Sequence, residues 1–264
     1  MKKYLVIGNP LNHSLSSKLH NFWIKKNNLN AIYKNKELNA SDIEETINDM
    51  KSGKVDGINV TLPYKKTVIP FLDHLTPFAD EAQSVNTIFK KKDKIFGDNT
   101  DIGGFEHCLK YINYDVKNKK IFILGAGGVV SSIILVLKKL KASKIYLSNR
   151  TKNKAKELEK ICGDLEILDW GSNTDFDMII NATSLGLKSD DQIKLDFSKL
   201  GSNKLFYDVI YNPSKTNFLL KGKELGNKIE NGKMMFIYQA QLAFKIWHNI
   251  LPPIDKETIK LLDI

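Results

Sequence analysis

The stretch Lys120-Ile-Phe-Ile-Leu-Gly-Ala-Gly-Gly-Val-Val130 decides the fold of this chain. An apolar run of strand length ends in a glycine turn, residues 125–130, and a helical pattern follows to residue 140. A second strand is predicted at residues 144–149. This order of strand, glycine turn, helix and strand is typical of a dinucleotide-binding unit, in which the helix N-terminus approaches a pyrophosphate.

Arg150 follows the second strand and is the only arginine among the 40 basic residues. Dinucleotide-binding units contact the adenine ribose at this point, where an acidic residue favours NAD. Here Asn149, Arg150 and Thr151 are followed by Lys154, which favours the 2′-phosphate of NADP. A guanidinium binds phosphate through two parallel hydrogen bonds. A surface arginine with no ligand is the alternative.

Strand and helix patterns alternate along the rest of the chain, which predicts an α/β fold with a parallel, doubly wound sheet. The expected strands are residues 2–8, 31–38, 57–62, 177–181 and 205–210, with a hairpin at 84–89 and 94–97. The expected helices are residues 16–27, 41–51, 101–111, 152–161 and 234–250. We expect Ser16 to cap the first helix, and Ser41 with Glu44 to form a capping box on the second.

The composition narrows the class of protein. The net charge of +10 suggests a nucleic-acid binder, but the lysines are spread along the chain without interleaved aromatic residues, which favours solvated surfaces instead. The longest apolar stretch, residues 121–137, is interrupted by glycine and serine, so we expect no membrane span. No signal peptide is predicted.

Cysteine and histidine usage is equally plain. Cys108 and Cys162 have no metal-binding or redox spacing, which predicts a reducing compartment and a cytoplasmic protein. The five histidines show no ligand pairing, so no metal site is expected.

Polar side chains collect near the ends of the early strands. Asn59 and Thr61 share one side of a strand that stops at Pro63, so Lys65 projects from its carboxyl end, where such sheets bind ligands. Ser14 and Ser16 follow the first strand, although an N-cap and a turn would also explain them. Asp101 starts a helix, where an N-cap is the alternative to a ligand site.

Together these motifs resemble the shikimate dehydrogenase family over essentially the full chain. In order they are the serine pair, NVTLPYK at residues 59–65, Asn86, NTD at 99–101, GAGG at 125–128, NRT at 149–151, NATSLG at 181–186, YNP at 211–213 and the late helix with Gln239.

The resemblance implies a two-domain enzyme that reduces 3-dehydroshikimate to shikimate with NADPH. It implies a substrate and catalytic domain at residues 1–101, completed by 237–264, and a Rossmann-like NADP domain at 102–236. The catalytic pair would be Lys65 and Asp101. Substrate would be bound by Ser14, Ser16, Asn59, Thr61, Lys65, Asn86, Asp101, Tyr211 and Gln239. The cofactor would be bound by Gly125, Ala126, Gly127, Gly128, Val129, Asn149, Arg150, Thr151, Lys154, Val209 and Gly232.

Three alternatives stay open. The first is a relative that also oxidises quinate or prefers NAD, which the serine pair and Arg150 disfavour, although Lys154 stands where members of the family often have a second arginine and could soften the preference for NADP. An NADP-binding regulatory module without catalysis is disfavoured by the joint presence of Lys65 and Asp101. A nucleic-acid binder is supported only by the charge. The sequence leaves open whether the chain is a monomer or a homodimer.

Overall fold

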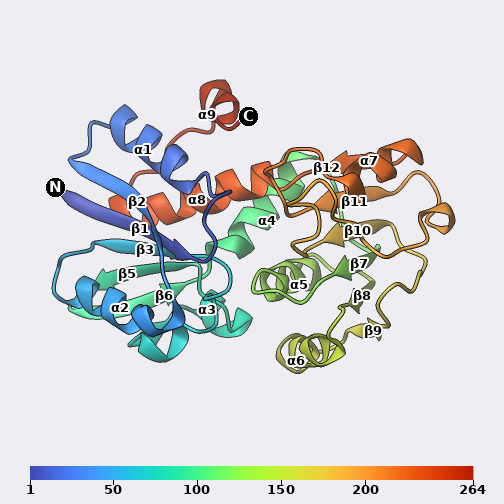
Figure 1. Ribbon diagram of the computed structural model, residues 1–264, viewed down its shortest axis with the longest axis horizontal. Helices are drawn as coiled ribbons and strands as arrows, with labels where there is room; N and C mark the ends of the chain where they lie inside the picture. The colour runs from blue at the N-terminus through green and yellow to red at the C-terminus, as the bar shows by residue number, and fades with distance from the viewer. Residues whose placement is uncertain (264) are drawn as a thin grey trace. The chain divides into compact units, whose positions relative to one another are not determined.

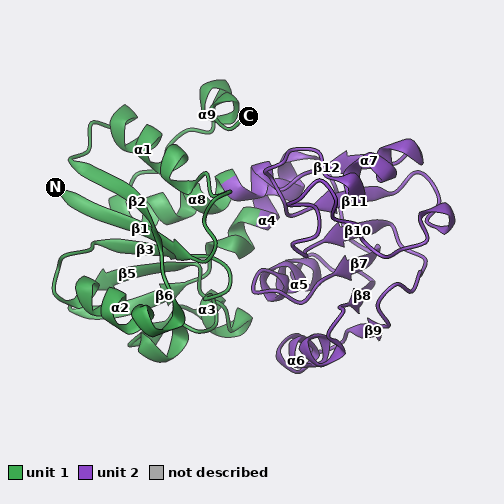
Figure 2. Cartoon of the chain, viewed as in Figure 1, with its two compact units in different colours: residues 1–104, 237–263 green, residues 105–236, 264 purple. Residues whose placement is uncertain are grey.

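The computed structural model describes residues 1–263, which form two compact units (Figures 1 and 2). Unit 1 comprises residues 1–104 and 237–263, and unit 2 comprises residues 105–236. The chain passes between them inside two helices, α4 (Thr100–Tyr111) and α8 (Lys233–His248). The two units divide after residue 104, whereas the sequence placed the boundary after residue 101, nearer the start of α4.

Unit 1 contains a mixed six-stranded sheet in the order β2-β1-β3-β5-β6-β4. Its strands are β1 (Lys2–Gly8), β2 (Ala31–Glu37), β3 (Gly57–Val60), β4 (His74–Leu75), β5 (Thr87–Lys91) and β6 (Lys94–Asp98). β1 runs parallel to β2 and β3, whereas β5 is antiparallel to β3 and β6. Thr87 on β5 is paired with both Asn59 and Asp98, so polar positions align across three strands.

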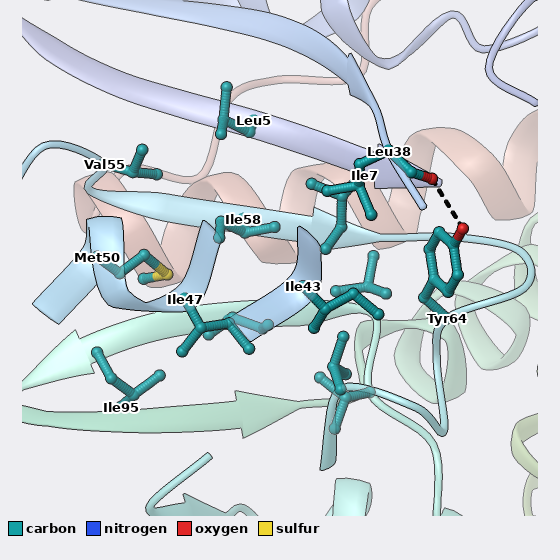
Figure 3. Packing of buried hydrophobic residues seen from close by; sticks show 14 of the residues in the cluster. Leu5, Ile7, Leu38, Ile43, Ile47, Met50, Val55, Ile58, Tyr64 and Ile95 are labelled. Atoms are coloured by element: carbon teal, nitrogen blue, oxygen red, sulfur yellow. Dashed lines mark hydrogen bonds between the residues drawn. The ribbon is translucent and has the colours of Figure 1, made fainter. Parts of the chain in front are cut away.

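Alternation along β1 divides the core of unit 1 between two faces of the sheet. Leu5 and Ile7 pack against α2 (Ile43–Lys51), as Figure 3 shows. Tyr4 points the other way and contacts Trp247 of α8, with ring centroids 5.0 Å apart. The other helices of this unit are α1 (Ser16–Lys26), α3 (Pro77–Ala82) and α9 (Lys256–Leu261), and short 3-10 turns lie at η1 (Ala40–Asp42) and η2 (Ile69–Phe71).

Unit 2 is the predicted doubly wound sheet, with six parallel strands in the order β12-β11-β10-β7-β8-β9. They are β7 (Lys120–Leu124), β8 (Lys144–Ser148), β9 (Glu166–Leu168), β10 (Met178–Asn181), β11 (Leu205–Asp208) and β12 (Lys228–Glu230). The helices of this unit include α5 (Val130–Lys139), α6 (Lys152–Cys162) and α7 (Asn217–Glu224), with a 3-10 turn at η3 (Phe197–Lys199).

The strand order of unit 2 reverses between β7 and β10, which are neighbours. Leu124 pairs with both Ser148 and Asn181, and Asn181 pairs with Asp208, so the carboxyl ends of four strands lie in register. Such a reversal is where doubly wound sheets bind their ligands.

Both predicted helix caps on α1 and α2 are wrong. α1 begins at Ser16 itself, and within the described residues no side chain caps it. The capping box near α2 involves Asn39 and Asp42 instead, because η1 precedes the helix and moves the start of the turn. None of the helices formed by residues 1–263 is long and apolar enough to cross a bilayer.

Candidate active site

Lys65 and Asp101 form a buried ion pair in unit 1. Lys65 Nζ lies 2.5 Å from Asp101 Oδ2, and the two side chains are only 11% and 7% exposed. Lys65 follows the turn after β3, where its carbonyl accepts a hydrogen bond from Val85 N at 2.8 Å. A pair this secluded loses hydration on both sides, so it is held in place only with further hydrogen bonds.

Asp101 is free to pair with Lys65 because Asn99 caps α4 in its place. The Asn99 side-chain oxygen accepts a hydrogen bond from Ile102 N at 3.2 Å. The N-cap alternative for Asp101 is therefore wrong, and its carboxylate points to the lysine and not back to its own helix.

Asn86 joins this pair to other polar groups. Its Nδ2 lies 3.0 Å from Asp101 Oδ1, 2.8 Å from Thr100 Oγ1 and 3.2 Å from Gln239 Oε1, so two hydrogens serve three acceptors. Its Oδ1 accepts from Thr100 N at 2.7 Å. The Asn86 amide thus joins three segments, which are the loop before β5, the start of α4 and the middle of α8.

Asn59 extends the network from β3. Its Nδ2 donates to Asn86 O at 3.0 Å and to Thr87 Oγ1 at 3.1 Å. Its Oδ1 accepts from the Tyr33 hydroxyl at 2.7 Å. Tyr33, Thr87 and Thr100 are absent from the predicted site. Thr87 directly follows the predicted residue Asn86, and Thr100 lies in the NTD motif directly before the predicted residue Asp101, whereas Tyr33 has the pattern of an ordinary strand residue.

The serine loop lies against the turn after β3. A Cβ on Gly8 would come within 2.5 Å of Thr61 Cγ2 and 2.9 Å of Leu62 O, so only glycine allows this approach. Asn9 N also donates to Leu62 O at 2.9 Å. Ser14 Oγ accepts from Ser16 N at 3.4 Å, which orients the Ser14 hydroxyl.

Tyr211, the remaining expected substrate residue, belongs to unit 2. Its ring stacks on Phe236 with centroids 4.4 Å apart and an interplanar angle of 24°.

The glycine turn of unit 2 passes close to the NATSLG segment. Gly125 has φ of +109°, and a Cβ there would lie 2.6 Å from Ala182 O. Gly125 N donates to Ser148 O at 2.8 Å, which brings the end of β8 beside the turn. α5 begins at Val130, and no side chain of the described residues forms a capping bond at Val129. The first turn of α5 therefore suits an anion.

Arg150, Thr151 and Lys154, which follow β8, are exposed, as a phosphate-binding group needs to be, and Asn149 is partly buried. Asn149 Nδ2 donates to Thr151 O at 2.8 Å and fixes the turn. The Arg150 and Lys154 side chains make no hydrogen bond or ion pair with any other residue in 1–263. Gly232 is packed as tightly as Gly125, because a Cβ there would lie 2.1 Å from Val209 O.

Asp208 organises the end of β11 and is absent from the predicted site. Its fully buried carboxylate accepts from Asn181 Nδ2 at 3.1 Å, Thr216 Oγ1 at 2.6 Å and Ile210 N at 3.0 Å. These donors are neutral, and burial raises the pKa of Asp208 to about 6. The only sequence signal was an acidic residue within an apolar strand.

This architecture is that of the α/β dinucleotide-binding oxidoreductases. A family model described as the shikimate dehydrogenase substrate binding domain matches residues 6–88, and a shikimate / quinate 5-dehydrogenase model matches residues 107–185. The chain belongs to the shikimate dehydrogenase family.

Individual relatives agree with this assignment. The chain is 58% identical over 263 residues to a shikimate dehydrogenase (NADP(+)) of Pelagibacter ubique, covering 100% of this chain and 99% of the relative. The shikimate dehydrogenase of Aquifex aeolicus superposes with a TM-score of 0.88 at 36% identity, covering 99% and 96% of the two chains. The Thermus thermophilus enzyme, solved with NADP(H) and shikimate, gives 0.89 at 28% identity, covering 99% and 98%.

Proposed function

We propose that the chain is an NADP-dependent shikimate dehydrogenase that reversibly reduces 3-dehydroshikimate to shikimate, a step toward chorismate and the aromatic amino acids. Membership of the family supports the reaction. The observation that carries it is the buried ion pair between Lys65 Nζ and Asp101 Oδ2, tied by Asn86 to a set of neutral polar groups. A merely structural role would not require a secluded charge pair here.

Lys65 is the proposed proton donor. NADPH supplies the hydride to the carbonyl carbon when it is bound. Negative charge then develops on the carbonyl oxygen, where the Lys65 ammonium stabilises it and donates the proton that completes the hydroxyl group. Asp101 holds the ammonium in place through the ion pair, and its negative charge partly neutralises that of the ammonium. In the reverse direction the lysine takes the proton back.

Neutral groups are assigned to the rest of the substrate. A polyhydroxylated ring requires fixed donors and acceptors, because each unmatched hydroxyl costs binding energy. We assign the carboxylate of the substrate to the serine loop. We assign its hydroxyl groups to Asn59, Thr61, Asn86, Tyr211 and Gln239, with Lys65 and Asp101 at the reacting oxygen.

The residues assigned to NADP belong to unit 2, and those assigned to the substrate belong to unit 1 except for Tyr211. The glycine turn, residues 125–129, is assigned to the pyrophosphate because it leads into the N-terminus of α5, and the close approach of Gly125 to Ala182 O requires a glycine in that turn. Asn149, Arg150, Thr151 and Lys154 are assigned to the adenosine 2′-phosphate. Val209 and Gly232 are assigned to the nicotinamide. Because Gly232 has no Cβ, it can pack closely on the backbone of Val209.

The test is oxidation of shikimate by the purified protein. We expect NADPH to form from NADP with shikimate, measured by its near-ultraviolet absorbance, and to form more slowly from NAD or with quinate. Absence of reduced cofactor with shikimate and either nucleotide would refute the proposed function. Faster reaction with NAD, or with quinate, would favour the alternative of a relative that prefers NAD or oxidises quinate.

We also infer a cytoplasmic location. Neither Cys108 nor Cys162 forms a disulfide within residues 1–263, which is typical of a reducing compartment. Fractionation of cells that express the full chain, with activity measured in each fraction, tests this inference.

A further inference from the structure

Asn59 has no donor left for a ligand. Both hydrogens on its Nδ2 are used, by Asn86 O and by Thr87 Oγ1. A backbone carbonyl can only accept, so the nitrogen must face Asn86 and the oxygen must face Tyr33. The remaining capacity of the side chain is the second lone pair on Oδ1. Asn59 can therefore accept a hydrogen bond from a ligand hydroxyl but cannot donate one.

Tyr33 sets this orientation from a position that is itself held firmly. Tyr33 lies on β2, the edge strand of the unit 1 sheet, and is 2% exposed. The Asn21 side chain forms two hydrogen bonds with the backbone of Tyr33. Its Oδ1 accepts from Tyr33 N at 2.9 Å, and its Nδ2 donates to Tyr33 O at 2.8 Å. Neither bond involves the hydroxyl, which stays directed at Asn59.

His20, the residue before Asn21 on α1, supports the ring of Tyr33. The two rings are parallel within 4°, with centroids 4.3 Å apart. His20 is fully buried, and neither ring nitrogen has a hydrogen-bond partner among residues 1–263. Burying two unpaired polar nitrogens costs free energy that a phenyl ring would avoid. The His20 ring also lies near Trp23, Phe244 and Trp247, and its stack on Tyr33 has the shortest centroid distance of these contacts.

We propose that Tyr33 is a positioning residue for the substrate, clamped by His20 and Asn21, and that its hydroxyl fixes Asn59 as a hydrogen-bond acceptor for one substrate hydroxyl group. This inference rests on the proposed function. It makes the site selective for a hydroxyl at that place over a ketone or a hydrogen atom, neither of which can donate.

The first test is Tyr33→Phe, which removes only the hydroxyl. We expect KM for shikimate to rise about fivefold, since a lost buried hydrogen bond costs on the order of 1 kcal/mol, with kcat and KM for NADP nearly unchanged. The matched control is Tyr114→Phe, whose hydroxyl donates to a backbone carbonyl, Asp177 O, at 3.2 Å in unit 2. The control should keep the wild-type KM for shikimate.

A double-mutant cycle separates positioning from general loosening of the fold. If Tyr33 acts through Asn59, Tyr33→Phe should have no further effect on KM in an Asn59→Ala background. His20→Ala should raise KM as Tyr33→Phe does, whereas His20→Phe keeps a flat ring and should restore it. An unchanged KM in Tyr33→Phe, or the same increase with and without Asn59, would overturn the proposal.

The failure of the proposed function would look different. If the wild-type protein does not turn over shikimate, the function is refuted while the positioning claim is judged on the side-chain amide resonances of Asn59. These should be slow to exchange in the wild type and should shift and broaden in Tyr33→Phe but not in Tyr114→Phe. Unchanged Asn59 resonances would overturn the positioning claim on their own.

Discussion

The two units bury their acidic groups in opposite ways. Asp101 in unit 1 has the Lys65 ammonium 2.5 Å away, whereas Asp208 in unit 2 is fully buried among neutral donors. Unit 2 keeps its proposed phosphate-binding cations, Arg150 and Lys154, at the surface. Unit 1 thus pairs opposite charges in its interior. Unit 2 uses its buried acid to hold the segments after β10 and β11, and its proposed recognition of charge depends on exposed side chains.

Removing the ion pair should have the largest effect. We expect Lys65→Ala to lower kcat by about a thousandfold, the range for loss of a general acid, while shikimate still binds. Lys66→Ala is the matched control, because Lys66 is the next residue and is exposed. Steady-state kinetics with direct binding of shikimate measure both effects. Similar kcat values for the two variants would remove Lys65 from the mechanism.

Acid should destabilise the protein through His20 of unit 1. Burial, followed by the nearby charge of His248, lowers the pKa of His20 to about 3 from its usual 6.5. As the pH drops below about 6.5, His20 therefore binds a proton in the unfolded chain but not in the folded chain, and the free energy of unfolding falls. One group costs about 1.4 kcal/mol per pH unit, or about 2 kcal/mol by pH 5. Burial lowers the pKa of His248 to about 4, which acts in the same direction.

Urea unfolding at about pH 7 and pH 5 measures this loss. His20→Phe should reduce the difference between the two conditions by about 2 kcal/mol. The exposed His13, changed to Gln, serves as the control and should leave the difference intact. An equal acid loss in wild type and His20→Phe would contradict the assignment to His20.

In unit 2, we expect the next largest effect from Arg150, the residue assigned to the 2′-phosphate of NADP. We expect Arg150→Ala to raise KM for NADP at least about tenfold, equivalent to about 1.4 kcal/mol, with little change in affinity for shikimate. Lys156→Ala, an exposed lysine on α6, is the control. Equal use of NADP and NAD by the wild type would show that Arg150 does not select the cofactor.

The smallest expected effect has the opposite sign to that of His20. The pKa of Asp208 is about 6 in the folded protein, above the usual 3.8, so the folded state holds a proton that the unfolded state releases. Its contribution to stability therefore rises as pH falls from about 6 toward 3.8, by about 1 kcal/mol in the first pH unit. Asp208→Asn should remove this gain, whereas the exposed Asp190→Asn should not. Identical pH profiles for the two variants would refute this role.

The sequence predicted the sheet of unit 2 well because parallel strands buried on both faces are continuous apolar runs, as in Ile121 to Leu124. It missed β9 and β12, the short edge strands of that sheet, which have one neighbour each and only partial burial. It also predicted neither α3 (Pro77–Ala82) nor α9, because each helix is too short to show a clear helical period.

The candidate site was predictable where a residue type is unusual for its place and hidden where it is not. Lys65 after Pro63 is unusual for its place, whereas an aspartate at a helix start is also common as an N-cap, so Asp101 was predicted from the NTD motif of residues 99–101. Tyr33 does not stand out, because a tyrosine in a strand is common and its role depends on contacts with α1 that are distant in sequence. Asp208 likewise acquires its role only from partners on β10 and beyond β11.

The two bonds between Asn21 and Tyr33 also bear on the solubility of the protein. β2 is an edge strand, and an unpaired edge can recruit a strand from another molecule and start aggregation. The Asn21 amide occupies the Tyr33 N–H and C=O, so the middle of that edge offers no template. Exposed Lys34 follows directly and repels a second copy of the same strand. One asparagine on α1 therefore supports the proposed site and blocks strand addition at Tyr33.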